Sequence, residues 1–214
     1  MPRLILIFVL ALAPSVRAAE ADPLVAPAHQ LEAGDPAWRD LLAQIEHRPD
    51  AVAGFEERRW FPFKKLPTVL KGEARVSAAR GLSLHYVEPQ ERTVIIDERG
   101  VLLREAGRET APPSDPRATA ANSAMLHLLR FDLKALAEIF EIYGERTGAA
   151  WTLALVPRAE PLRRTLGQIT VAGENAAVRR IELRRSLTQR VEIFIESSRP
   201  PAAFTDGELH RFFR

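Results

Sequence analysis

Hydrophobic and polar residues alternate with a period of two in the stretch GLSLHYVE, residues 81–88. In an extended chain Leu82, Leu84 and Tyr86 lie on one face, and the residues between them lie on the other. The same period recurs on both sides of this stretch. It predicts strands at residues 52–61, 66–78, 81–88, 92–97 and 100–105. The connections are too short for crossovers, so the strands are expected to form an antiparallel meander.

A helical period precedes these strands. Asp35 and Pro36 form a favourable helix start, because Asp caps a first turn well and Pro suits the first helical position. Trp38, Leu41 and Ile45 then recur at the spacing of one helical face. We therefore expect an amphipathic helix that begins after Asp35 and ends at the next proline.

The stretch GRETAPPSDPRA, residues 107–118, contains three prolines, which exclude a regular strand or helix. It predicts a hinge loop. Residues 119–147 then return to the helical period and predict two short helices, with Asp132 as the cap between them. Their apolar stripes consist of Ala121, Ala124, Met125, Leu128 and Leu129, and of Leu133, Leu136, Ala137 and Phe140, widened by Ile139 and Tyr143. A hinge of this composition lets the helices act as a lid.

The strand period resumes after these helices. It predicts strands at residues 151–155, 167–172, 178–185 and 189–196, followed by a last helical turn at residues 205–213. With eight or nine strands and few helices, the chain is expected to be α+β and mainly β. Residues 35–214 are long enough for a single domain with its own core.

The N-terminus has the pattern of a secretory signal peptide. A positive residue precedes an apolar run at residues 4–13, and small residues allow cleavage near Ala18. The run is shorter than the roughly 20 residues of a membrane span, although an uncleaved anchor is the alternative. Residues 19–34, rich in Ala and Pro, predict a mobile leader. We therefore expect residues 1–18 to be removed and the protein to be soluble and periplasmic.

Composition narrows the function classes. The chain has no cysteine, so it carries neither a lipid anchor at the cleavage site nor a disulfide. The net charge of +2 comes from Arg3 and Arg17 in the predicted signal, which leaves 28 basic and 28 acidic residues in the remainder. This balance argues against a nucleic-acid partner, which favours a strongly basic surface.

Chemistry-bearing motifs are scarce. No two of the five histidines have metal-ligand spacing, and the G-x-S-x-G, Walker and G-x-G-x-x-G motifs are missing. Asp97 and Glu98 are neighbours on a strand, so their carboxylates diverge. We predict no catalytic residue, no metal and no cofactor, and no enzymatic activity. A hydrolase assembled from residues distant in sequence remains a less favoured alternative.

Arginines concentrate in the last third of the chain, where Arg180, Glu182 and Arg184 share the polar face of a predicted strand. One interpretation is a solvated outer face whose charges protect the sheet from aggregation. The other is a basic patch for an acidic partner or for anionic headgroups. We favour the first, because the interleaved Glu182 and Glu192 dilute the positive charge.

The whole order of elements resembles the periplasmic outer-membrane lipoprotein carrier family, LolA and its relatives, in its divergent branch. Three stretches carry the resemblance: VAGFEERRW at residues 52–60, GEARVSAARGLSLHYVEPQERTVIIDERG at residues 72–100, and the leucine-rich helix pair followed by WTLALVPR at residues 151–158. The resemblance implies an unclosed, strongly curved antiparallel β-barrel, with an N-terminal helix and a helical lid over an apolar concave face.

Family members accept acyl chains of lipoproteins and ferry them towards the outer membrane without covalent chemistry. By resemblance, the partners are an inner-membrane release complex and an outer-membrane acceptor, with transient membrane contact and a monomeric carrier. The housekeeping carriers hold their lid with an Arg-Pro pair, whereas the matching positions here are Ala78 and Ala79, and Arg80 points to the other face. The closing mechanism and the cargo, a lipoprotein or a glycolipid, therefore stay open.

A carrier needs an apolar lining, and the stripes supply candidates on the sheet and on the lid. The predicted cargo-binding residues are Leu82, Leu84, Tyr86, Val94, Ile96, Met125, Leu128, Leu129, Leu136, Phe140, Trp151, Leu153 and Leu155. Periodicity alone leaves open which face of the sheet is concave. The alternative is a structural or receptor-like β module of the outer membrane, in which the same stripes form an ordinary core without a cavity.

Overall fold

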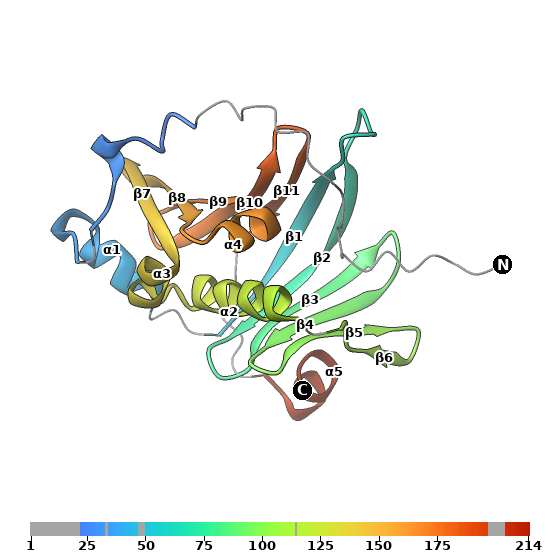
Figure 1. Ribbon diagram of the computed structural model, residues 1–214. Helices are drawn as coiled ribbons and strands as arrows, with labels where there is room; N and C mark the ends of the chain where they lie inside the picture. Colours follow the sequence, from blue (N-terminus) through green and yellow to red (C-terminus); the bar gives the residue numbers. More distant parts are fainter. Residues whose placement is uncertain (1–21, 33, 47–49, 114, 197–203) are drawn as a thin grey trace.

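The computed structural model describes residues 22–32, 34–46, 50–113, 115–196 and 204–214. In this part of the chain, eleven strands form one antiparallel sheet in the order β6-β5-β4-β3-β2-β1-β11-β10-β9-β8-β7 (Figure 1). The strands are β1 Ala51–Trp60, β2 Thr68–Ser77, β3 Gly81–Glu88, β4 Arg92–Asp97, β5 Gly100–Glu105, β6 Arg108–Thr110, β7 Phe140–Thr147, β8 Ala150–Pro157, β9 Gln168–Glu174, β10 Ala177–Ser186 and β11 Gln189–Ile195. The edge strands β6 and β7 do not pair, so the curved sheet is unclosed.

Helices lie before, between and after the two runs of strands, and one lies within the second run. They are the 3-10 turn η1 Pro27–His29 and the α-helices α1 Pro36–Glu46, α2 Pro116–Arg130, α3 Leu133–Ile139, α4 Glu160–Leu166 and α5 Asp206–Phe212. The expected caps are present. Asp35 accepts a hydrogen bond from the backbone N–H of Ala37, and Asp132 accepts one from Ala135 at the start of α3.

The connectivity explains how helices end up inside a β protein. Strands β1 to β6 form one meander and β7 to β11 a second, and the last strand returns to pair with the first, with Phe55 opposite Ile195. Helices α2 and α3 occupy the connection between the two meanders and cross the sheet (Figure 1). A lid placed at this point in the chain therefore touches both halves of the sheet.

The strand register identifies the concave face. Leu84 lies opposite Val94 and Ala74, and Ala74 lies opposite Ala53 on β1. On the other half, Leu153 lies opposite Val171. Following the pairs across β1 and β11 puts all eight predicted strand positions on one face. They are Leu82, Leu84, Tyr86, Val94, Ile96, Trp151, Leu153 and Leu155.

Helices α1, α3 and α4 cover this same face over β7 to β10, and α2 lies beside α3 and α4 and reaches over β3 to β5. Trp38 of α1 lies directly on Gly144 of β7, where a Cβ atom would come within 2.5 Å of the indole. Trp38 and Leu41 join buried residues of α2, α3 and the strands in one core cluster. The fold is thus a mainly β, unclosed and strongly curved sheet with an N-terminal helix and a helical lid over its apolar concave face, as expected.

The main differences from the predicted elements concern β6, the start of α2, β7 and α4, and the bounds of several other strands differ by one or two residues. Residues 107–118 are not wholly irregular, since β6 occupies Arg108–Thr110 and α2 begins at Pro116. The lid helices end at Ile139, because Phe140–Thr147 forms strand β7 rather than helix. Helix α4 and strand β6 were not predicted, and the number of strands is eleven rather than eight or nine.

The segment before α1 is packed, in contrast to the expected mobile leader. Leu24 is buried against Tyr143 and Ala154, and the Asp22 carboxylate accepts a hydrogen bond from Gln168. Gln30 forms an isolated bridge with Tyr143. The predicted signal peptide at residues 1–18 lies outside the described residues. Among the helices that the structure describes, none has the length and apolarity needed to cross a bilayer.

Candidate functional site

The lid and the second half of the sheet meet in a continuous apolar cluster. Leu128, Leu136 and Phe140 contact the same cluster as the strand residues Trp151, Leu153 and Leu155, and each of these six is buried. Met125 packs against the cluster and is half-buried, as is Leu129. The structure therefore brings the predicted residues of this half together, but in this conformation their side chains contact one another.

The first half of the concave face is less covered. Leu82, Leu84, Val94 and Ile96 of β3 and β4 are half-buried, although they lie on the same face as the core. We call these four residues the apolar strip. Leu84 and Val94 pack against a small cluster formed by Phe55, Leu70 and Tyr86. The apolar strip is partly exposed and lies beside the lid. It is therefore the candidate surface for binding an apolar ligand.

Helix α2 borders the apolar strip and is fastened by polar contacts. The Asn122 side chain donates a 3.0 Å hydrogen bond to the backbone oxygen of Asp97, at the turn between β4 and β5. The Arg130 guanidinium forms a 3.0 Å ion pair with Glu98 in the same turn. Sequence reasoning missed both contacts. Surface ion pairs contribute about 0–1 kcal/mol, so these contacts hold the lid weakly.

The two positions that the resemblance matches to the Arg-Pro pair of the housekeeping carriers do not take part in these contacts with α2. Ala78 and Ala79 are exposed in the turn between β2 and β3, where the Ala78 amide donates to the Asp50 carboxylate. Arg80 is also exposed in this turn. Asn122 and Arg130 therefore fasten the lid in this structure from the helix side, whereas a lock of the housekeeping type would start from the strand.

A polar cluster terminates the apolar strip at the end of β3. The Tyr86 hydroxyl donates to one Glu57 oxygen at 2.5 Å, and the Arg59 guanidinium donates to the other at 2.5 Å. Burial, together with the negative charge of Glu57, raises the pKa of Tyr86 well above its usual range, so its proton stays on the hydroxyl. Arg92 lies over the Tyr86 ring at 4.8 Å. The strip thus ends at two cations and one buried carboxylate.

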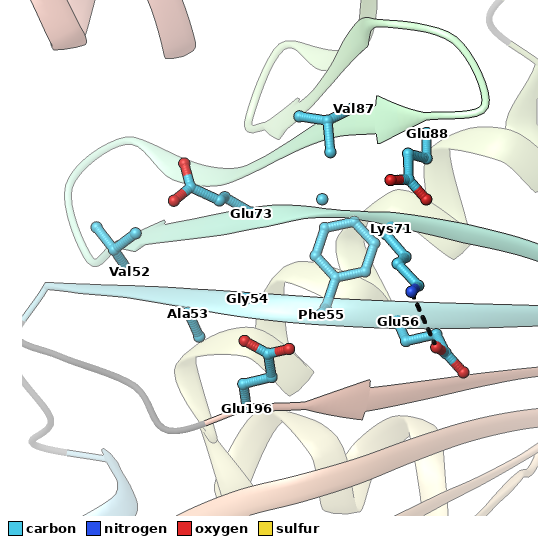
Figure 2. Close-up of a pocket in the computed structure, with 11 residues that line it drawn as sticks. Val52, Ala53, Gly54, Phe55, Glu56, Lys71, Glu73, Val87, Glu88 and Glu196 are labelled. Atoms are coloured by element: carbon cyan, nitrogen blue, oxygen red, sulfur yellow. Dashed lines mark ion pairs between the residues drawn. The ribbon is translucent and has the colours of Figure 1, made fainter.

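Two hollows in the described structure are lined by residues other than the predicted cargo-binding ones. One, of about 460 Å³, lies over β1, β2 and β3, and Figure 2 shows its acidic side chains Glu56, Glu73, Glu88 and Glu196. By register, Glu56 and Glu196 lie on the face opposite Phe55. A second hollow, of about 200 Å³, is lined by residues that include Arg163, Arg184 and Leu187. Neither hollow includes a predicted cargo-binding residue, so those residues remain a prediction.

The arginines of β10 form ion pairs with neighbouring glutamates. Arg180 lies 2.6 Å from Glu192, and Arg180 and Arg184 both pair with the buried Glu182. The Trp60 indole also donates to Glu192 at 2.6 Å. Glu182 is only 2% accessible, so these charges are paired and partly buried rather than freely solvated as the favoured interpretation expected. The choice between an outer face and a basic patch stays a prediction. Among the described residues, no three His, Cys, Asp or Glu side chains gather as metal ligands.

Comparison with known proteins places this arrangement in a family. The family model for outer membrane lipoprotein carrier protein LolA-like domains matches residues 31–205. No curated protein matches the sequence.

Several solved structures are similar to this chain, at low sequence identity and low TM-score. A LolA superfamily protein from Nitrosomonas europaea is 7% identical, over 79% of this chain and 95% of its own, with a TM-score of 0.43. Lipoprotein LppX from Mycobacterium tuberculosis is 12% identical, over 79% and 99% of the two chains, with a TM-score of 0.42. LprF from Mycobacterium bovis is 9% identical, over 83% and 98%, with a TM-score of 0.39. Because these similarities are low, the family assignment rests on the family model, and by that match the chain belongs to the LolA-like family of outer membrane lipoprotein carrier proteins.

Proposed function

We propose that this protein is a periplasmic carrier that binds the acyl chains of a lipoprotein or a related lipid and moves them towards the outer membrane. The observation that carries the proposal is the half-buried apolar strip beside a weakly fastened lid. Membership of the LolA-like family supports a carrier of lipid or lipoprotein and not an enzyme. Signal-peptide cleavage near Ala18, a monomeric state, and loading and release partners in the two membranes belong to the same proposal.

Binding follows from the hydrophobic effect. An acyl chain gains about 0.8 kcal/mol for each methylene it buries, without needing specific polar contacts. The chain would enter between α2 and the apolar strip, where Leu84 and Val94 are only partly covered by the protein itself. Lid side chains that now pack on one another, such as Leu128, would pack on the acyl chain instead. Release then needs a competing apolar surface and no chemical step.

The polar cluster gives the ligand a direction. Arg59 and Arg92 lie at the end of the apolar strip, next to Tyr86. Guanidinium groups bind carboxylates and phosphates well. An amphiphile therefore fits with its tail along the strip and its polar end towards this cluster.

The proposal is tested by two substitutions in strand β3. Leu84→Asp puts a charge on the apolar strip, whereas Val87→Asp puts one on an exposed position of the same strand, 51% accessible. We expect the first variant to lose binding of a fluorescent fatty acid by at least about tenfold, the cost of leaving a carboxylate against an acyl chain. The second is expected to bind like the unchanged protein. Equal binding by both variants, with both folded by circular dichroism, contradicts the proposal.

A structural β module without cargo is the second candidate. It is favoured by the close packing of Leu128, Leu136 and Phe140 against Trp151 and Leu153. Native mass spectrometry of the protein purified from a bacterial periplasm separates the two. Co-purified lipid or lipoprotein supports the carrier. A mass without ligand that also fails to change on adding fatty acid supports the structural module.

A further inference from the structure

The connection between β1 and β2, residues 61–67, exposes large apolar side chains. Phe63 is 79% and Leu66 is 77% accessible, and the sequence of the connection reads FPFKKLP. Val69, at the start of β2, is 43% accessible. Single exposed apolar residues are common on protein surfaces, but several at one tip indicate a site of interaction.

The exposure is part of an ordered turn. The rings of Phe61 and Phe63 stack with their centroids 5.4 Å apart. The Lys64 backbone N–H donates to the Phe61 oxygen at 3.1 Å, and its ammonium group donates to the Thr68 hydroxyl at 3.0 Å. These contacts hold Phe63 in an outward position, so its exposure is a property of the folded hairpin.

A second turn, between β10 and β11, lies beside the connection between β1 and β2. Strand β1 pairs with β11, and Trp60 at the end of β1 lies opposite Arg190 near the start of β11. The β10–β11 turn therefore projects from the same end of the sheet as residues 61–67, as Figure 1 shows. Leu187 in this turn is 53% accessible. We call residues 61–67 and 186–189 together the hairpin tip.

The charge around the hairpin tip is one-sided. Residues 58–72 and 183–191 contain eight Lys and Arg and no Asp or Glu, in a chain with 30 basic and 28 acidic residues. Five of the eight pair with glutamates farther along the strands: Arg58, Arg59, Lys71, Arg184 and Arg190. Lys64, Lys65 and Arg185 form no ion pair with any residue that the structure describes. The tip thus combines protruding apolar groups with uncompensated positive charge.

We propose that the hairpin tip docks on an anionic lipid bilayer, with Phe63, Leu66 and Leu187 in the interfacial layer and Lys64 and Lys65 among the headgroups. A bilayer fits better than a protein partner, because Phe63 and Leu66 protrude from a narrow turn and line neither of the two hollows described above. Basic residues gain from the negative surface potential, and their aliphatic stems tolerate the interface. Arg59 and Tyr86 of the polar cluster lie near this end of the sheet, so docking would turn the end of the apolar strip towards the membrane.

The test uses the full mature chain and vesicles of phosphatidylcholine with or without phosphatidylglycerol. We expect binding in flotation assays that requires phosphatidylglycerol and weakens with salt. Phe63→Ser/Leu66→Ser and Lys64→Glu/Lys65→Glu are each expected to weaken it at least about tenfold. Val87→Ser and Arg80→Glu/Lys134→Glu change exposed residues outside the tip and serve as matched controls, expected to bind normally.

A second readout reports insertion directly. In Phe63→Trp, bromine-labelled lipids are expected to quench the new fluorophore, whereas in Val87→Trp they are not. Absence of binding to anionic vesicles, equal binding by tip and control variants, or self-association that depends on Leu66 in analytical ultracentrifugation each overturns the proposal. Fatty-acid binding by the tip variants is expected to be unchanged, so failure of the docking proposal and failure of the carrier proposal give different results.

Discussion

The Glu57 carboxylate is a buried negative charge on the mainly apolar concave face. It is 3% accessible, and Tyr86 and Arg59 each donate to one of its oxygens. Burying an ionised group is costly unless hydrogen bonds and an opposite charge compensate. The three side chains therefore act as one unit, and removal of any member leaves the others incompletely satisfied.

We expect Tyr86→Phe to lower the free energy of unfolding by about 1–3 kcal/mol, because it removes a hydroxyl donor from a buried carboxylate. Tyr143→Phe is the matched control, since the Tyr143 hydroxyl donates at 3.1 Å to Glu141, which is much more accessible. That substitution should cost less than about 1 kcal/mol. Urea unfolding at neutral pH measures both. If both substitutions lower the free energy of unfolding equally, the hydrogen bond to the buried Glu57 contributes no more to stability than one to an accessible carboxylate.

Among the helices, α5 covers the face of β2 to β5 that is opposite the concave face. The residues that follow it form a latch, the pair of hydrogen bonds between Arg214 and Asp97. Phe212 lies between the Arg75 guanidinium, 3.6 Å from its ring, and His85. Arg214 then donates two 2.6 Å hydrogen bonds to the Asp97 carboxylate. The backbone oxygen of the same aspartate accepts the hydrogen bond from Asn122 of the lid. The β4–β5 turn therefore joins the C-terminal helix and the lid from opposite faces.

We expect Arg214→Ala to destabilise the protein by about 1.5–3 kcal/mol near neutral pH, the range for hydrogen bonds to charged groups. Partial burial alone raises the pKa of Asp97, but the hydrogen bonds from Arg214 lower it overall. A lowered pKa stabilises the folded state above the ordinary value of 3.8, and this stabilisation is lost as the pH falls through the lowered value.

The difference between the unchanged protein and Arg214→Ala should therefore be largest near neutral pH and shrink below the ordinary Asp pKa. Urea unfolding at a series of pH values checks this. Arg211→Ala is the control, because Arg211 pairs at 3.4 Å with the exposed Glu91 and should contribute at most about 1 kcal/mol. A difference that stays constant or grows on acidification would mean that the latch does not act through the Asp97 charge.

At the scale of the whole molecule, the proposed carrier needs α2 to move relative to the sheet. The chain has no cysteine, so a thiol reagent modifies only the two cysteines that are introduced. Arg130→Cys/Glu98→Cys replaces the ion pair between α2 and the β4–β5 turn. Joining the two with a reducible bismaleimide linker should abolish uptake of a fluorescent fatty acid, and reduction of the linker should restore it. Unchanged uptake by the linked protein would show that α2 need not lift.

Prediction from the sequence succeeded where one period dominated. Strands β3, β4 and β5 begin and end where the two-residue alternation does, and Asp35 and Asp132 cap the helices that their positions indicate. Strand β7 was missed because its apolar residues, such as Phe140 and Tyr143, continue the spacing of the preceding helix. Pairing with β8 and the β-bridge between Gln30 and Tyr143 favour a strand there. The local sequence pattern contains no information about such distant partners.

Residue type and spacing are enough to predict the alternating strands and the amphipathic helices between them, and residue counts give the balanced charge and the lack of cysteine. The folded structure identifies the concave face, because only the register across β1 and β11 places Leu84 and Leu153 on the same side. It also decided which apolar residues are core and which are exposed. Leu128 and Phe63 are both strongly hydrophobic, but Leu128 packs from the lid helix α2 into the core, whereas Phe63 projects from the hairpin tip. Burial depends on what the rest of the chain brings to each position, and only the folded structure contains that information.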